Sequence, residues 1–384
     1  MKPAVDILIV GGGIVGLSAA IAMRQRHFSV AILDAGSLSL DLNVPNTRVY
    51  ALNQASQRLL DGLGVWPRIA PAYISPYQQM HVWDGGSGAH IDFDARLTGA
   101  DRLGVILEES VLKHALLEEA MALGVELCPG HTVNAVQTTA EGVSLQTETN
   151  HWNARVLIVA DGALSTTREL LGVPMTTWPY HQDAIVATIQ TEKPHQHTAY
   201  QVFTSDGPLA FLPLTDPHRC SIVWSTTRAN ALMNLSEEAF TIALAEAFES
   251  KLGACHLRSA RHAFPLHMRH AERYSGPGWL LMGDAAHTIH PLAGLGLNVG
   301  LADLAAWRSL CDAHPKRAVG SHQTLGAYQR QRKSAVWKTI ALMGGLKTLF
   351  ANPLPPVVAL RGLGLSVFNH WSALKRLCVE HAAG

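Results

Sequence analysis

The sequence predicts an α/β fold with a discontinuous parallel-sheet domain, an inserted antiparallel-sheet domain and a helical C-terminal tail. Short apolar runs that end in glycine or an acidic residue occur near residues 10, 160 and 282, and such runs are typical of buried parallel strands. Alternating apolar and polar runs between residues 184 and 224 indicate antiparallel strands instead. The length of 384 residues suits about two domains, and 48% hydrophobic against 16% charged residues excludes a disordered chain.

The composition also excludes several classes of partner and site. The formal net charge is zero and no basic stripe interleaves with aromatic residues, so we expect no nucleic-acid partner. The five cysteines are far apart without a CxxC pair, which argues against a disulfide framework and favours a reducing, cytoplasmic compartment. The twenty histidines lack an HExxH frame, so we expect no metal site. The apolar run 7–23 is interrupted by glycines, and we expect it to be part of the fold rather than a signal peptide.

The N-terminal segment carries a dinucleotide-binding pattern. Strand Val5–Val10 leads into the GxGxxG match GGGIVG at residues 11–16, and a helix Leu17–Arg26 and a strand Val30–Leu33 follow. This order predicts a Rossmann-like unit in which the glycines let the backbone approach a pyrophosphate, while Asp34 accepts a ribose hydroxyl. The pattern fits NAD or FAD, and a purely structural glycine turn is the alternative.

A single arginine follows this unit. Arg48 comes just before a predicted helical segment and is placed to reach a phosphate or a ribose, unless it is an ordinary surface arginine. Farther along, residues 76–97 predict a β-hairpin around an Asp-Gly-Gly turn, and residues 107–123 predict a helix. The strands expected after it cover residues 125–136, 143–147 and 156–160, the last of which ends in Asp161-Gly162.

The second half of the chain returns to the first domain. Four strand-like runs within residues 184–226 predict an antiparallel sheet, and a helix is expected over residues 236–251. In the stretch Trp279–Gly300, a buried strand ends at Asp284 and a helix begins between Gly294 and Asn298. The N-terminus of a helix beside the carboxyl end of a strand favours a ligand that carries negative charge.

Taken together, these motifs resemble the flavin-dependent aromatic hydroxylases of the para-hydroxybenzoate hydroxylase type, and more narrowly the ubiquinone-biosynthesis hydroxylases. The matching segments span nearly the whole chain in the order of the family, and the block from residue 283 is the most specific. They are GGGIVG at 11–16, RVYAL at 48–52, LGVI at 103–106, ADGA at 160–163, QVF at 201–203, GPLAFLPL at 207–214, GDAAHTIHPLAG at 283–294 and GLN at 296–298.

The resemblance implies bound FAD in a discontinuous domain of the glutathione reductase type. The first glycines and Asp34 would hold the ADP half, Asp161-Gly162 would serve both FAD and the nicotinamide donor, and residues 291–298 would lie against the isoalloxazine. The residues assigned to the cofactor in this way are Gly11, Gly13, Ile14, Val15, Gly16, Asp34, Arg48, Val133, Asp161, Gly162, Gly283, Asp284, Pro291, Gly294, Gly296, Leu297 and Asn298. The chain departs from the family at Leu295, where glutamine is usual, and at Glu109-Ser110, where asparagine and arginine are common.

The same resemblance implies the reaction. With FAD, NAD(P)H and O2, a flavin C4a-hydroperoxide would transfer its distal oxygen to the ring of a polyprenylated phenol in ubiquinone biosynthesis. No second GxGxxG follows a strand, so NAD(P)H would bind transiently. Two alternatives stay open: a hydroxylase of a small soluble aromatic compound or secondary metabolite, and a non-catalytic flavin-binding subunit of a biosynthetic assembly, towards which Leu295 points.

The residues that would bind the phenol are less defined. An apolar pocket formed by Phe203, Phe211, Pro213 and Trp224 suits such a substrate, although large apolar residues at strand spacing also fit a plain core. No residue is identified as a catalytic acid or base. The expected division assigns residues 1–75, 98–178 and 268–330 to the FAD domain and residues 76–97 and 179–267 to the substrate domain.

The remaining residues, 331–384, form the tail. Seven basic residues face only Glu380 in this tail, a net charge of +6, and apolar residues recur at helical spacing from Val336 to Phe350. Such a helix either rests on an anionic membrane or packs on the FAD domain with a solvated basic face, and both can hold at once. We expect peripheral contact with the inner face of the membrane, without a span, and we leave assembly with other biosynthetic proteins and homo-oligomerisation open.

Overall fold

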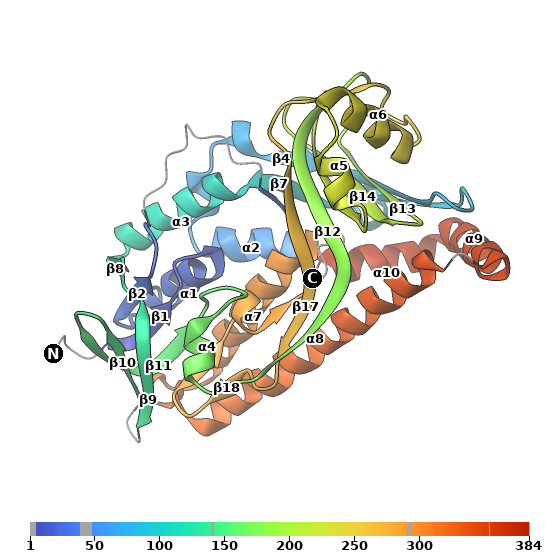
Figure 1. Ribbon diagram of the computed structural model, residues 1–384. Helices are drawn as coiled ribbons and strands as arrows, with labels where there is room; N and C mark the ends of the chain where they lie inside the picture. The colour runs from blue at the N-terminus through green and yellow to red at the C-terminus, as the bar shows by residue number, and fades with distance from the viewer. Residues whose placement is uncertain (1–4, 39–47, 140–141, 290–293, 353, 384) are drawn as a thin grey trace.

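The first domain is built around a parallel sheet. The computed structural model describes residues 5–38, 48–139, 142–289, 294–352 and 354–383. In the first sheet β1 lies between β11 and β2, and all three strands run parallel (Figure 1). In spatial order its main strands are β18 (Ser275–Gly276), β19 (Trp279–Leu281), β11 (His151–Val159), β1 (Val5–Val10), β2 (Val30–Asp34) and β8 (Glu126–Pro129).

The predicted β1–α1–β2 unit is confirmed. Helix α1 (Ile14–Arg24) starts directly after the glycines, earlier than the sequence suggested. A Cβ atom on Gly16 would lie 1.9 Å from the carbonyl oxygen of Gly11, so only glycine lets α1 approach the end of β1 this closely. The side chains of β1, α1 and β11 form the main hydrophobic core, in which Leu8, Leu17 and Leu157 are fully buried.

Smaller elements surround this sheet. The strands predicted over 125–136 and 143–147 are β8 followed by the antiparallel pair β9 (Val133–Thr139) and β10 (Gly142–Thr147). The helix expected from residue 107 begins later, because residues 104–108 are still in a strand. A three-stranded sheet consists of β3 (Val49–Asn53), β7 (Gly104–Glu108) and β4 (Ser75–Tyr77), and the nearby helices are α2 (Gln54–Gly62), α3 (Glu109–Ala122) and α4 (Thr166–Leu170).

The second large sheet is mostly antiparallel, as predicted, and includes the predicted hairpin. Its long strands β12 and β17 also pair across a register shift between Pro179 and Asp183. In spatial order the sheet contains β20 (His287–Thr288), β17 (His262–Ala271), β12 (Met175–Thr191), β15 (Arg219–Thr226), β14 (Gly207–Pro213), β13 (Thr198–Thr204), β5 (Gln79–Asp84) and β6 (His90–Asp94), and β16 (Cys255–Leu257) pairs with β12.

Two helices cover one face of this sheet. Helices α5 (Ala229–Met233) and α6 (Glu237–Ala247) contribute Leu232, Phe240 and Leu244 to a second hydrophobic core with the sheet. In Figure 1, α6 lies at the top of the view, far from α1 and β1. This face of the sheet is therefore closed by the protein itself.

Four helices end the chain. Helix α7 (Leu295–Ala313) confirms the predicted helix start, and α8 (His322–Ala351) is one long helix that ends directly before Asn352-Pro353. Helices α9 (Pro355–His370) and α10 (Ser372–Ala383) follow, and α9 lies beyond the end of α8 (Figure 1). No described helix combines the length and the apolar character needed to cross a bilayer.

The apolar stripe predicted for the tail is internal. Val336, Ile340, Met343 and Phe350 are each less than 9% exposed, the first two in the main core and the last two beside Phe203. The second interpretation of this helix, packing on the body of the protein, therefore holds for these residues, and they offer no apolar face to a membrane.

Candidate functional site

A cavity of about 360 Å³ lies at the carboxyl ends of β1, β2 and β11. Because the three strands are parallel and adjacent, the residues that follow them converge at one edge of the sheet. Six of the residues assigned to FAD line this cavity: Gly11, Gly13, Asp34, Val133, Asp161 and Gly162. Segments that are more than a hundred residues apart in the sequence therefore line one cavity.

The glycine turn forms one wall of the cavity. Asp34 accepts hydrogen bonds from the backbone N–H of Gly12 at 2.5 Å and of Gly36 at 2.8 Å, which fixes the carboxylate at the end of β2. A Cβ atom on Gly13 would meet no atom within 4 Å, so the backbone here is open to a ligand. Ile14 and Val15 begin α1, and the Val15 side chain packs beside the backbone of Gly283.

The segment after β11, which lies against Gly11 of the glycine turn, carries polar atoms whose hydrogen-bonding capacity is not used within the described residues. Asp161 Oδ1 and Thr167 Oγ1 are buried and have no hydrogen-bond partner among those residues. Buried polar atoms are almost always paired, so these two atoms fit a polar ligand in the cavity. The open glycine backbone, the Asp34 carboxylate and these atoms together fit the ADP half of FAD.

Several residues of this cavity were missed by the sequence analysis, among them Thr167, Lys113 of α3 and His131. The Lys113 ammonium would add a donor near a pyrophosphate, whereas the ring nitrogens of His131 contact Pro129 O and the Asn150 side chain. Lys113 lies within a helix that the sequence predicted, but no motif marks which face of that helix meets the cavity. His131 follows β8, and only the placement of that strand beside β2 brings it here.

Asp284 follows β19 and marks a second region of the site. Burial raises the pKa of the Asp284 carboxyl above its usual range, and the neighbouring His287, Arg48 and Arg269 oppose this shift. Arg48 also forms an ion pair with Glu109 at 3.6 Å and lies over the ring of Tyr50, whose hydroxyl donates to Glu109 at 3.0 Å. Glu109, which departs from the family pattern, is thus a partner of Arg48.

A buried ionic network supports the turn before Asp284. The fully buried carboxylate of Asp303, on α7, accepts hydrogen bonds from Gly283 N at 2.9 Å, His287 Nε2 at 2.7 Å and Arg332 Nε at 2.6 Å. Burial alone would raise the pKa of Asp303, but His287 and Arg332 hold the pKa of this carboxyl below its usual range. The sequence analysis missed this role, and the available signal was an acidic residue inside the apolar helix ADLAAW.

The start of α7 completes this region. Gly294, at a φ of 64°, precedes the helix, and the first-turn N–H groups there offer a positive dipole end. The Asn298 side chain donates to the carbonyls of Ala51 and Gly294 and accepts from Asn53 N and Ser56 Oγ, so it joins α7 to β3 and to the start of α2. Gly296 borders open space, whereas Leu297 packs on the main core. Pro291 and the side chain of Leu295 lie outside the described residues.

The predicted apolar pocket is wrong. Phe211 stacks on Phe248 at a centroid distance of 3.6 Å, and Trp224 packs beside Phe240 of α6, so both belong to the second core. Pro213 is buried and, two residues after Phe211, lies on the same face of β14. Phe203 points to the opposite face, where it stacks on Phe350 of α8 at 4.0 Å.

The physical reason is strand alternation. Side chains one residue apart on a strand point to opposite faces, and one face of this sheet is covered by α6. The other face of β12, β14 and β15 includes Val186, Ala210 and Val223, which are cross-strand neighbours and only half-buried. The sequence analysis selected the largest apolar residues, which are the ones that the core uses.

Known proteins match the whole chain. The family model described as "FAD binding domain" matches residues 4–342. The chain is 35% identical over 388 residues to the 3-demethoxyubiquinol 3-hydroxylase of Escherichia coli (strain K12), with 99% of this chain and 98% of that protein covered. It is 32% identical over 387 residues to the ubiquinone hydroxylase UbiL of Rhodospirillum rubrum, with 99% and 89% covered.

The fold is also that of solved monooxygenase structures. The p-nitrophenol 4-monooxygenase PnpA of Pseudomonas putida DLL-E4 superposes with a TM-score of 0.83 at 19% identity, and the match covers 100% of this chain and 99% of that one. The family model and the full-length relatives agree with the FAD-compatible cavity described above. The chain therefore belongs to the family of FAD-dependent aromatic hydroxylases that includes the ubiquinone-biosynthesis hydroxylases.

Proposed function

We propose that this enzyme hydroxylates the aromatic ring of a polyprenylated phenol in ubiquinone biosynthesis, with FAD, a reduced nicotinamide and O2. The observation that carries the substrate class is the similarity, over 99% of the chain, to a 3-demethoxyubiquinol 3-hydroxylase. FAD, when bound, supplies the activation of oxygen, and the protein supplies binding, orientation and exclusion of water.

The residues of the cavity would hold the cofactor. Gly11, Gly13 and Asp34 would bind the ADP half, and Asp161-Gly162 would lie at its other side. Asp284 and the start of α7 would lie near the flavin ring system, where N–H groups of the first helical turn stabilise negative charge. We also propose the division predicted from the sequence, with residues 1–75, 98–178 and 268–330 binding FAD and residues 76–97 and 179–267 binding substrate.

The phenol would bind on the face of the second sheet that α6 leaves open. Val186, Ala210 and Val223 form an uncharged row across three strands of this face. Phe264 of β17, opposite Ala184 of β12, adds an aromatic ring that is 54% exposed. An apolar surface of this kind suits a ring that bears a long hydrocarbon chain.

The C-terminal helices would keep the enzyme at a membrane as a peripheral protein. Four lysines of residues 331–384 have no carboxylate partner among the described residues, whereas Arg332, Arg361 and Arg376 pair with Asp303, Asp84 and Glu380. The positive charge available to an anionic surface is therefore smaller than the formal +6. Contact with the inner face of the membrane would then depend mainly on apolar side chains.

Complementation tests the reaction. Bacterial strains that each lack one ring hydroxylase of ubiquinone biosynthesis would receive this chain or its Gly13→Asp variant, and quinone intermediates would be measured by mass spectrometry. We expect the native chain, but not the variant, to restore ubiquinone in one strain. If a flavin-loaded protein accumulates and rescues none, the ubiquinone substrate is wrong, and phenol-dependent oxidation of NAD(P)H would then distinguish a small-aromatic hydroxylase from a non-catalytic subunit.

A further inference from the structure

Helix α9 presents an apolar face to solvent. Leu360, Leu363 and Val367 are 70%, 63% and 53% exposed, and Trp371, at the end of the helix, is 58% exposed. The spacing of Leu360, Leu363 and Val367 by three and four residues places them on one side of α9, and Trp371 directly follows the last helical residue, His370. We call these four residues the α9 stripe.

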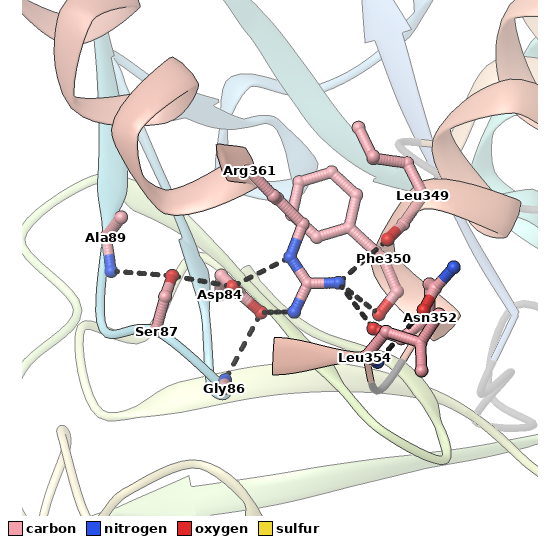
Figure 2. A network of polar contacts seen from close by, with 9 residues as sticks. All are labelled: Asp84, Gly86, Ser87, Ala89, Leu349, Phe350, Asn352, Leu354 and Arg361. Atoms are coloured by element: carbon pink, nitrogen blue, oxygen red, sulfur yellow. Dashed lines mark hydrogen bonds and ion pairs between the residues drawn. The ribbon is translucent and has the colours of Figure 1, made fainter. Parts of the chain in front are cut away.

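The orientation of the α9 stripe is fixed by the other side of the helix. Arg361 is buried and binds both oxygens of Asp84, with Nε and Nη2 each 2.9 Å from the carboxylate (Figure 2). Its Nη1 also donates to the carbonyls of Leu349 and Phe350 at the end of α8, at 2.8 and 2.9 Å. Because a bidentate arginine pair tolerates little rotation, it locks the helix in one phase about its axis.

Packing beside Arg361 enforces the same phase. A Cβ atom on Gly362 would lie 3.0 Å from the Cβ and Oγ atoms of Ser87, so this side of α9 is in close contact with the turn between β5 and β6. Asn369, farther along, accepts a hydrogen bond from the backbone N–H of Asp92 on the edge strand β6. The α9 stripe points away from these contacts and has no room to turn inwards.

The chemistry around the α9 stripe favours a lipid surface over a second copy of this chain. In residues 354–384 the sequence has three basic residues, of which Arg361 is buried and Arg376 pairs with Glu380, the only acidic residue of this segment. Lys375 and Arg376 follow Trp371 by about one helical turn. If two copies paired through this stripe, these cations would repel the same cations of the second copy. An anionic bilayer would instead attract them.

We propose that the α9 stripe inserts into the boundary between headgroups and acyl chains of an anionic bilayer. This inference deepens the proposed function, because a polyprenylated substrate resides in the membrane. Tryptophan at the end of an apolar helix face is typical of side chains at this depth. The Asp84–Arg361 pair then connects the inserted helix rigidly to the substrate-binding sheet.

Vesicle binding of the full-length, FAD-loaded protein tests the proposal without turnover. Vesicles of phosphatidylethanolamine and phosphatidylglycerol would be sedimented with the native protein, with Leu360→Ser/Val367→Ser, and with the matched control Met121→Ser/Ile242→Ser, whose residues are 58% and 54% exposed on other helices. We expect the stripe variant to lose about tenfold or more in binding, because it removes several methylene and methyl groups from the inserted surface, and we expect the control to bind like the native protein.

A second measurement does not depend on the serine variants. Lipids brominated along the acyl chain should quench native tryptophan fluorescence more than that of Trp371→Phe. Equal quenching, equal vesicle binding of the two double variants, or no binding by the native protein would each overturn the proposal. If the native protein forms a dimer that the stripe variant cannot form, the proposal is also overturned, because the stripe would then bind a second copy of the chain. None of these results depends on the hydroxylase reaction, which complementation tests separately.

Discussion

Arg332 of α8 donates a hydrogen bond from Nε to the buried carboxylate of Asp303 on α7, at 2.6 Å. Through Asp303 the arginine is connected to the Gly283 N–H and to His287, and so to the turn that places Asp284. A residue of the C-terminal segment therefore holds the part of the site nearest the predicted flavin ring.

Removing this arginine should uncouple the turn from α8. Arg332→Met leaves a buried carboxylate with one fewer cation, and we expect the free energy of unfolding to fall by about 3–5 kcal/mol. Urea denaturation of the apoprotein measures this loss, and titration with FAD should show weaker binding. Arg330→Met, two residues away and exposed, is the control. A double variant Asp303→Asn/Arg332→Met that loses the full sum of the two single effects would contradict a direct pairing.

Substitutions at two glycines of the GxGxxG turn should affect folding and FAD binding separately. Gly13 has open space where a Cβ would lie, so Gly13→Asp should leave the unfolding temperature of the apoprotein unchanged. Its carboxylate would weaken FAD binding by about tenfold or more, because a like charge near the pyrophosphate costs about 1–4 kcal/mol. Gly16→Ala should destabilise the apoprotein by about 1–3 kcal/mol through contact with Gly11. Differential scanning calorimetry and flavin fluorescence measure the two effects, and equal behaviour of the variants would refute the distinction.

Substitutions on the two faces of the second sheet should affect KM for the phenol differently. Phe211→Leu should lower the free energy of unfolding by about 1–3 kcal/mol and leave KM for the phenol unchanged, because Phe211 packs on Phe248. Val223→Ala, on the open face, should raise KM by about tenfold through the loss of contact with an apolar substrate. Steady-state kinetics with a short-chain prenylphenol measures both KM values. If only Phe211→Leu raised KM, the pocket predicted from the sequence would be correct after all.

The unfolding free energy should decrease in mild acid partly through His270. Burial, together with the neighbouring Lys333 and His287, lowers the pKa of His270 to about 4. An unfolded histidine has a pKa near about 6.5, so below that pH the unfolded chain takes up a proton that the folded chain does not. Stability from His270 is therefore present above about pH 6.5 and is lost as the pH falls towards 4.

Substitution of the ring tests this contribution. His270→Phe cannot take up a proton, so its unfolding free energy should depend less on pH between about 6.5 and 4 than that of the native protein. The exposed His151, changed to phenylalanine, should leave the native pH dependence in place. Chemical denaturation at a series of pH values provides the comparison, and parallel curves for native protein and His270→Phe would show that another group is responsible.

The Asp84–Arg361 pair should hold α9 in place. Arg361→Met should increase hydrogen–deuterium exchange in residues 354–370 and lower the free energy of unfolding by about 3–5 kcal/mol, since Asp84 remains buried. Lys375→Met, which removes only a hydrogen bond to Asn369, is the matched control. Unchanged exchange in α9 would mean that packing at Gly362 is sufficient.

Much of the first domain was predictable because local patterns encode it. The residues of β1, the glycine turn and Asp34 lie within one short stretch of the sequence. Their spacing along the chain is therefore enough to indicate a dinucleotide site. The network of Asp303 could not be predicted in the same way. Its partners come from residues 283, 287 and 332, and only the packing of α7 against α8 brings them together.

The sequence by itself determined the family, the cofactor-binding pattern and the order of the elements. Only the tertiary structure decided which apolar side chains are internal. In the second sheet, burial by α6 turned Phe211 and Trp224 into core residues, because neighbouring side chains of a strand point to opposite faces. In the tail, the apolar spacing of α8 and of α9 looks alike, yet α8 buries its stripe while Arg361 turns that of α9 outwards. Helical spacing shows that a face exists, and only long-range contacts determine where that face points.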